Sequence, residues 1–258
     1  MSRNHGLLTA LLLTAVLALP ASAQLGFPNV ELGEIDSECV SVCFGNVATC
    51  DQGGTINQVA IEPPFHVRGL RLADADDDFC ANQAGITNRV LRLPVTLAAG
   101  QVLVFDVDMV ADQIGSFSQP LIVNGGEVTD VDVNILAPGP CAPAATDSLC
   151  MDNNRFAVRS FWRTDFGTRG NSTKVPDVAS DDSGLFYFFN ENNWEMLVKV
   201  LDGCGVNGHF WVFNAAATNV EYWLTVTDTQ TDEVQTYFNP LGQRAVAIQD
   251  LDAFATCP

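Results

Sequence analysis

Apolar and polar residues alternate along several short segments of this chain, and this pattern constrains the fold more than any other feature of the sequence. Side chains of a β-strand point to opposite faces in turn, so an alternation with a period of two predicts strands. The clearest case is 102–110, whose apolar residues are Leu103, Phe105, Val107 and Met109. Asp106 and Asp108 lie between them and are expected to face outward.

The same alternation recurs in both halves of the chain. Gly, Asn, Asp and Pro residues bound these segments, as is typical of strands in all-β proteins. The further candidate strands are 128–136, 155–163, 185–190, 196–201, 209–213, 220–227 and 233–238. No segment has a convincing helical periodicity, and about six or seven short strands in each half are typical of a β-sandwich. The sequence therefore predicts an all-β fold of two sandwiches.

A proline-rich segment, 137–146, separates the two strand-rich halves and has the composition of a linker. The eight cysteines divide evenly around it. They are Cys39, Cys43, Cys50 and Cys80 before it, and Cys141, Cys150, Cys204 and Cys257 from the segment onward. We therefore predict two domains, 24–136 and 147–258, each with two disulfides.

The first 23 residues have the order of a secretory signal peptide. Arg3 supplies the basic start, the run from Leu7 to Leu19 is apolar, and Ala21 and Ala23 are the small residues that a signal peptidase reads. We expect cleavage before Gln24 and a secreted protein, extracellular or periplasmic. An even number of cysteines behind such a signal is typical of disulfide bonds.

The cysteine spacing limits the pairings. In an extended segment, Cys39 and Cys43 would lie about 13 Å apart, beyond the roughly 7 Å that a disulfide spans. Two pairings of the first half stay open: 39–50 with 43–80, or 39–80 with 43–50. In the second half we expect a local Cys141–Cys150 bond and a Cys204–Cys257 bond, because Cys204 lies in a turn and can hold the C-terminal tail.

The chain is strongly acidic, with 31 acidic and 12 basic residues and a formal net charge of −19. Loss of Arg3 with the signal would change this charge to −20. Such a charge repels phosphate backbones and anionic lipids, so we expect neither nucleic-acid binding nor a membrane-surface role. We also expect no membrane insertion, because the apolar start is shorter than the roughly 20 residues of a spanning helix.

Two acidic clusters are weak candidates for calcium. Asp74, Asp76 and Asp78 form the first, but an EF-hand loop beginning at Asp74 would need Gly and an acid where Phe79 and Gly85 stand. Asp181 and Asp182 form the second, in an Asp-Asp-Ser-Gly sequence that is typical of a turn. Both clusters are expected to be solvated loops, and no cofactor is expected.

No residue set predicts catalysis. Ser183, His209 and Asp202 supply the residue types of a hydrolase triad, but the chain has no G-x-S-x-G turn to expose the serine. We expect His209 to be a packed or edge-exposed side chain and the protein to be a non-enzyme.

Aromatic residues crowd the candidate strands near 185–190 and 209–213. Alternation places Phe186, Phe188 and Phe210 on one side of the sheet. It places on the other side Tyr187, Phe189, Trp211 and Phe213. Both faces would be apolar, so the second face is either an interface with the neighbouring domain, which we favour, or a ligand surface.

The first half resembles the Ig-like modules of the ASH/Hydin and major-sperm-protein type over about 38–135. The resemblance rests on LPVTLAAGQ at 93–101, FDVDM at 105–109 and GSFSQPLIV at 115–123. These match a turn that precedes a strand and a hairpin that follows it. MVA at 109–111 stands where the family usually has F-x-P. The resemblance implies an Ig-like β-sandwich.

The second half resembles an uncharacterised C-terminal module of secreted bacterial proteins over about 141–257. The matching segments are NRFAV at 154–158, DDSGLFYFF at 181–189, LVKVLDG at 197–203, NGHFWVF at 207–213 and LTVTDT at 224–229. That module is attached to varied extracellular proteins, so the resemblance implies an accessory role and a β-sandwich without established chemistry.

Together these observations predict two Ig-like β-sandwich domains in tandem, stapled by disulfides. The expected function is non-enzymatic interaction outside the cell or at its surface, with an extracellular protein or glycan as the partner. The alternative is an accessory carbohydrate- or peptide-binding module that assists an extracellular enzyme.

Overall fold

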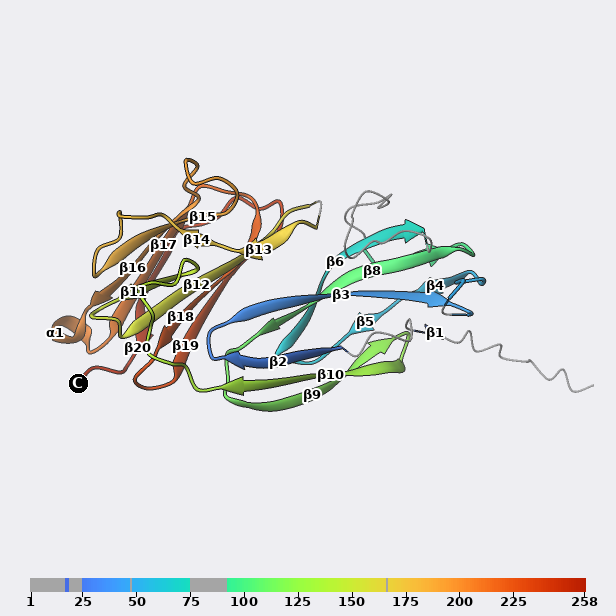
Figure 1. Ribbon diagram of the computed structural model, residues 1–258, viewed down its shortest axis with the longest axis horizontal. Coiled ribbons are helices and arrows are strands. Elements are labelled where there is room, and N and C mark those ends of the chain that lie inside the picture. Colours follow the sequence, from blue (N-terminus) through green and yellow to red (C-terminus); the bar gives the residue numbers. More distant parts are fainter. Residues whose placement is uncertain (1–16, 19–24, 47, 75–91, 166) are drawn as a thin grey trace, which may run out of the picture.

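The computed structural model describes residues 17–18, 25–46, 48–74, 92–165 and 167–258. Its elements are almost all strands, which confirms the all-β prediction (Figure 1). Within these ranges, one short helix occurs, α1 (Cys204–Asn207). Most of the predicted signal peptide lies outside the described residues, as do Asp76, Asp78 and Cys80.

The strands before residue 137 form two four-stranded sheets and a small two-stranded one. The first has the order β1 (Leu17–Ala18), β3 (Ile35–Phe44), β8 (Gln101–Val110), β6 (Phe65–Asp74). The second has the order β2 (Gly26–Glu31), β10 (Gly126–Leu136), β9 (Gly115–Val123), β5 (Val59–Ala60). β4 (Gly54–Ile56) pairs with β7 (Val95–Leu97).

The two larger sheets share one apolar core. It includes Phe27 of β2, Val40 of β3, Phe105 of β8, Leu121 of β9 and Val133 of β10. These residues are buried because the alternation along each strand sends every second side chain toward the opposite sheet. The predicted inward face of 102–110 is therefore confirmed.

The strands after residue 147 form two further sheets. One has the order β11 (Ser148–Met151), β12 (Phe156–Arg163), β18 (Glu221–Asp228), β19 (Glu233–Asn239), and β13 (Arg169–Asn171) also pairs with β12. The other has the order β14 (Thr173–Lys174), β15 (Ser183–Tyr187), β16 (Met196–Asp202), β17 (Phe210–Ala216), β20 (Ile248–Phe254). Their shared core includes Phe156, Phe186, Val198, Phe210 and Leu224.

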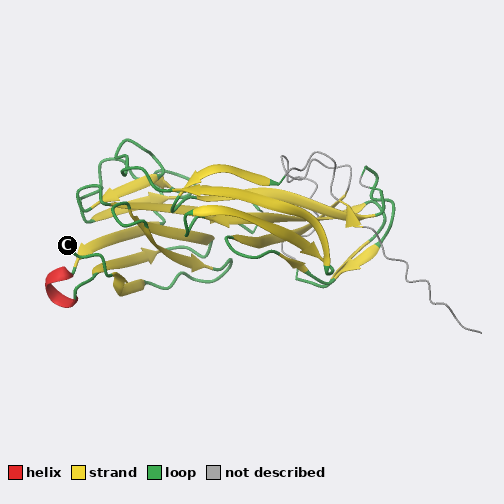
Figure 2. Cartoon of the chain, turned by 90° about the horizontal axis from the view of Figure 1, so that it is seen from below, coloured by secondary structure: helices red, strands yellow, loops and turns green. Residues whose placement is uncertain are grey.

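Each strand pair joins strands of the same half among the described residues, and no strand lies in 137–146. The strand pairing thus divides at the segment for which a linker was predicted. The two halves lie end to end, and the view turned by 90° shows an elongated molecule (Figures 1 and 2).

Three disulfides join described cysteines: Cys43–Cys50, Cys141–Cys150 and Cys204–Cys257. The last two are the bonds expected in the second half. In the first half the structure contains the local 43–50 bond, so the pairing of Cys39 with Cys50 is wrong. Cys39 is also disulfide-bonded.

Candidate binding face

One face of the sheet formed by β14, β15, β16, β17 and β20 carries large apolar side chains that no core encloses. We call it the aromatic face, and its members are Leu185, Tyr187, Leu197, Lys199, Leu201, Trp211, Phe213 and Gln249. They share the face because the register pairs Leu185 with Leu197 and Leu201 with Trp211. It also pairs Phe213 with both Lys199 and Gln249.

The opposite face of the same strands forms the core. Phe186, Phe210 and Val212 are buried, whereas Tyr187, Trp211 and Phe213 are partly exposed. The alternation that the sequence predicted is therefore present on β15 and β17. Sheet residues on the aromatic side keep contact with solvent, and Leu197 is 37 % exposed.

Phe189 does not belong to the aromatic face. We expected a strand over 185–190, but β15 ends at Tyr187 and the chain turns. The ring of Phe189 instead packs edge-on against Trp162, with 4.7 Å between the ring centres. The predicted surface of four aromatic residues therefore contains three of them in one face.

Trp211 is fixed in place by two neighbours. Its indole Nε1 donates a hydrogen bond to Oδ1 of Asn207, at 2.8 Å. Asn207 in turn donates from Nδ2 to the carbonyl oxygen of Leu251, also at 2.8 Å. The indole lies so close to Gly203 that a Cβ there would collide with the ring. Asn207 and Gly203 thus hold the partly exposed indole of Trp211 in one orientation.

Polar side chains border the two partly exposed rings of β17. Lys199 and Gln249 stand on either side of Phe213 in the strand register. Near Trp211, the His209 Nδ1 lies 3.0 Å from the carbonyl oxygen of Asn207 and 3.9 Å from Oδ1 of Asp252. The face therefore combines aromatic planes with hydrogen-bond donors and acceptors at their edges.

The other sheet of the second half meets the first half through buried charges. Arg163 on β12 pairs with Asp106 at 3.2 Å, with Asp108, and with Glu221 at 2.8 Å. The Arg163 side chain is 2 % exposed and both aspartates are fully buried. We call this region the junction.

Two further arginines complete the charge pairing at the junction. Arg71 donates to both carboxylate oxygens of Asp106, at 2.9 and 3.1 Å. Arg169 reaches the same carboxylate at 2.9 Å. The Ser37 hydroxyl donates to Asp108 at 2.7 Å. Asp106 and Asp108 were expected to face outward, and that expectation is wrong: the second half covers them, and both halves supply their partners.

Burial and charge act in opposite directions on the pKa values of the junction. Burial lowers the pKa of Arg163, but Asp108, Asp106 and Glu221 outweigh it and raise that pKa above its usual value. Burial raises the pKa of Glu221 above its usual value, although Arg163 pulls it down. Arg163 therefore stays charged, and its charge is required to balance the buried carboxylates.

Apolar contacts surround these charges. Ile35 and Val110 of the first half pack with Phe161 and Trp223 of the second. The ring of His66 lies on that of Trp223, with 5.2 Å between their centres. The junction is thus a packed interface in which the ion pairs are enclosed.

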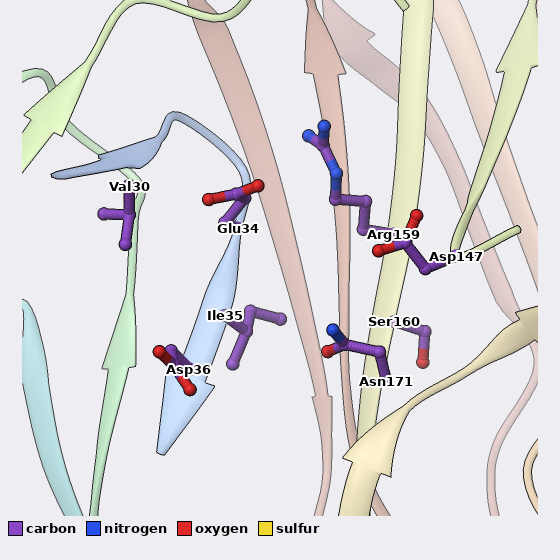
Figure 3. Close-up of a pocket in the computed structure, with 8 residues that line it drawn as sticks. All are labelled: Val30, Glu34, Ile35, Asp36, Asp147, Arg159, Ser160 and Asn171. Atoms are coloured by element: carbon purple, nitrogen blue, oxygen red, sulfur yellow. The ribbon is translucent and has the colours of Figure 1, made fainter. Parts of the chain in front are cut away.

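A pocket of about 200 Å³ opens beside the junction, between β3 and β12 (Figure 3). Glu34, Asp36 and Asp147 line it, and Arg159 and Asn171 point into it from the second half (Figure 3). Arg159 pairs with Glu31 at 3.5 Å. No group of three metal-ligating side chains occurs among the described residues, in this pocket or elsewhere.

Of the predicted acidic clusters the structure describes Asp74, Asp181 and Asp182, whereas Asp76 and Asp78 lie outside the described residues. Asp74 ends β6 and is exposed. Asp181 is engaged in a turn, where its side chain accepts a hydrogen bond from the Asn153 amide at 2.8 Å. The amide of Asp182 bonds to the Ser180 hydroxyl at 3.3 Å. These contacts are the turn chemistry expected of Asp and Ser.

The triad residue types are likewise not brought into contact. Asp202 accepts a hydrogen bond from the Cys204 amide at 2.8 Å, and His209 contacts Asn207. No hydrogen bond links Ser183, His209 and Asp202 within the described structure.

Sequence reasoning missed the junction arginines. A signal was present, because Val102, Val104 and Val110 share the face of Asp106 and Asp108 on β8. A strand that is apolar on both faces is typically covered on both. That pattern indicates that a second element packs on this side, although it does not identify Arg163.

No family model and no curated protein matches this chain. Two solved structures align over most of it. Domains 5-6 of the S-layer protein SbsC are 15 % identical over 93 % of this chain and 97 % of that chain, with a TM-score of 0.23. A protein of unknown function from Bacteroides ovatus is 8 % identical over 90 % of this chain and 91 % of that one, with a TM-score of 0.24. These values are too low to indicate a function.

The chain is thus an all-β, disulfide-bonded protein with a charged internal junction and an exposed aromatic sheet face. No helix in the described ranges has the length and apolar character of a membrane span.

Proposed function

We propose that this is a secreted, non-enzymatic binding protein of two Ig-like β-sandwich domains, and that the aromatic face is its contact surface. The observation that carries the proposal is the composition of that face. Leu197 and Leu201 of one strand and Trp211 and Phe213 of its partner share this face and keep solvent contact. A contiguous exposed apolar surface with a polar border is typical of an interaction site.

The disulfides support the location. Three bonds between described cysteines, with Cys39 bonded as well, suit an oxidising compartment. The sequence of residues 1–23 has the pattern of an export signal. A binding role outside the cell, or at its surface, is consistent with both.

The absence of enzymatic activity is part of the proposal. The partly exposed aromatic rings are bordered by single polar groups rather than by a nucleophile with its base. The ion pairs of Arg163 with Asp106 and Asp108 are enclosed at the junction. Charge pairs of this kind serve the fold.

The test is binding to the natural surroundings of the protein. Labelled mature protein is sedimented with whole cells of the producing organism and with its extracellular matrix. We expect the protein to be retained, and the double variant Trp211→Ala/Phe213→Ala to lose most of that retention. Trp194→Ala is the matched control, because Trp194 is an exposed tryptophan outside the aromatic face.

Equal retention of the wild type and the double variant would show that another surface makes the contact. Absence of retention of the wild type on either material would refute a binding role at the cell surface or matrix.

A further inference from the structure

We infer that the aromatic face binds a neutral polysaccharide, with Trp211 and Phe213 as the stacking surface. This inference rests on the proposed binding function and gives the chemical class of the ligand. It follows from the spacing of the rings, their fixed orientation, the polar groups beside them and the charge of the chain.

The two rings form a short row. Trp211 and Phe213 are two residues apart on β17, so their Cα atoms lie about 7 Å apart and their side chains share one face. The face of an aromatic ring carries negative charge density. A sugar ring presents a flat surface of weakly positive C–H groups, which suits such a plane, as cations do.

The larger ring is held before any ligand arrives. The Asn207 hydrogen bond fixes the indole plane, and Gly203 leaves the space for it. The Cys204–Cys257 disulfide ties down the start of α1, the helix that ends at Asn207. Fixing an aromatic group in its binding orientation reduces the entropy lost on association.

The border of the rings suits hydroxyl groups. Lys199 offers three donors on one side of Phe213, and the Gln249 amide offers donors and an acceptor on the other. The carboxylate of Asp252, 80 % exposed beside His209, adds an acceptor near Trp211. A sugar has C–H groups on its faces and hydroxyl groups at its edges, so it can stack on the aromatic rings while its hydroxyls bond to the polar groups beside them.

The charge of the molecule selects among ligands. A net charge of −19 repels anionic polymers and a second copy of the chain alike. In a two-fold pair, the same patch of each copy lies against the other, so the negative charges of two copies would also be brought together. A neutral polymer carries neither cost. A protein partner remains the competing class, and the experiment separates the two.

The experiment uses the mature protein and four insoluble or gel-embedded neutral polysaccharides: microcrystalline cellulose, chitin, mixed-linkage β-glucan and starch. Polygalacturonate serves as the anionic comparison. We expect retention on at least one neutral polymer and none on polygalacturonate. Trp211→Ala should weaken that retention at least about tenfold, the loss typical of an aromatic anchor at the centre of a contact. Gln249→Ala should weaken it less, and Trp194→Ala should leave it unchanged.

Circular dichroism and the melting midpoint show whether each variant keeps the fold. Retention of a folded Trp211→Ala variant at the wild-type level would overturn the inference. So would the absence of wild-type retention on all four neutral polymers.

A second arm separates this inference from the proposed function. Cells or matrix that retain the protein are treated with periodate, which cleaves vicinal diols of glycans, or with a protease. Loss of retention after periodate alone supports the polysaccharide. Loss after protease alone, with retention still dependent on Trp211, would overturn the polysaccharide and leave the proposed binding function intact. Absence of retention on untreated material would refute both.

Discussion

The junction and the aromatic face reverse the usual distribution of polar and apolar groups. At the junction, Arg163, Asp106 and Asp108 lie where solvent does not reach them. On the aromatic face, Leu197, Trp211 and Phe213 keep contact with water. Both regions are outer faces of sheets whose inner faces form ordinary apolar cores.

The difference is whether the chain itself supplies a partner. The outer face of β8 is covered by the second half, which provides an arginine for the carboxylates and Trp223 for His66. The outer face of β17 has no such cover among the described elements. Carboxylates that are buried within the molecule require positively charged side chains of the same chain. An apolar face that stays in contact with solvent indicates that a separate molecule binds there.

The largest expected effect is at the junction. Arg163→Met removes the cation that faces three carboxylates and leaves Asp106 and Asp108 buried without it. Breaking a buried ion pair in this way typically costs about 3–5 kcal/mol. Urea unfolding should show this loss in the free energy of unfolding. Arg244→Ala, at an exposed arginine, is the control and should change it by less than about 0.5 kcal/mol.

A loss below about 1 kcal/mol for Arg163→Met would contradict the view that the junction depends on charge balance. It would mean that the apolar contacts around Ile35 and Phe161 hold the halves together without the ion pairs.

The next largest effect is expected from loss of the Cys204–Cys257 disulfide, which holds the start of α1. Cys204→Ser/Cys257→Ser opens a loop of 53 residues, whereas Cys141→Ser/Cys150→Ser opens one of 9. Loop-closure entropy predicts a loss near the upper end of about 2–4 kcal/mol for the first, and about 1.6 kcal/mol less for the second. Thermal unfolding of both double variants measures the difference. The first should also loosen Asn207 and weaken binding, and the second should leave binding unchanged.

Equal destabilisation by the two double variants would show that the unfolded chain does not respond to loop length. Unchanged binding by the first would show that α1 holds Asn207 without the disulfide.

A smaller effect on stability is expected on the aromatic face itself. Trp211 and Phe210 are neighbours on β17 whose side chains point to opposite faces. Phe210→Ala empties a core position and should cost about 3–5 kcal/mol. Trp211→Ala should cost about 1 kcal/mol or less, because the indole is partly solvated in the free protein. The free energies of unfolding of the two variants, measured with a chemical denaturant, test whether Trp211 contributes to the stability of the fold.

A stability loss for Trp211→Ala as large as that for Phe210→Ala would place the indole among the structural residues. The aromatic face would then be explained by the stability of the fold, and the argument that it is a binding site would fail.

The sequence predicted the parts of this molecule that depend on local pattern. The period-two alternation gave the strands and the two sides of β17, since strand geometry alone determines them. Turn chemistry at Cys204 indicated the bond to Cys257. The position of Phe189 was mispredicted because a strand end depends on tertiary contacts, here with Trp162, which the local pattern does not contain.

The junction could not be predicted for the same reason. Asp106 and Asp108 alternate with core residues exactly as solvated aspartates do, and Arg163 lies 55 residues beyond Asp108 in the sequence. Only the packing of one half on the other brings these charges together. The same packing decides which apolar face is covered. The sequence analysis favoured a domain interface for the aromatic residues, whereas the first half packs against Phe161 and Trp223 of the other sheet.

The smallest expected effect is an acid sensitivity confined to the junction. Burial lowers the pKa of His66 below its usual 6.5 and Arg68 lowers it further, while Asp108 and Asp112 oppose the shift. Below pH 6.5 the unfolded imidazole therefore binds a proton that the folded one still lacks, and the free energy of unfolding falls as the pH decreases until the folded pKa is reached. His66→Gln, which does not titrate, should lack this decline between pH 7.5 and 5. Unfolding curves across that range measure it, and binding through the aromatic face, which does not contain His66, provides the comparison. If the free energy of unfolding falls equally with pH in the wild type and in His66→Gln, protonation of His66 does not oppose its packing against Trp223. The enclosed charges of the junction would then tolerate the additional positive charge of the imidazolium.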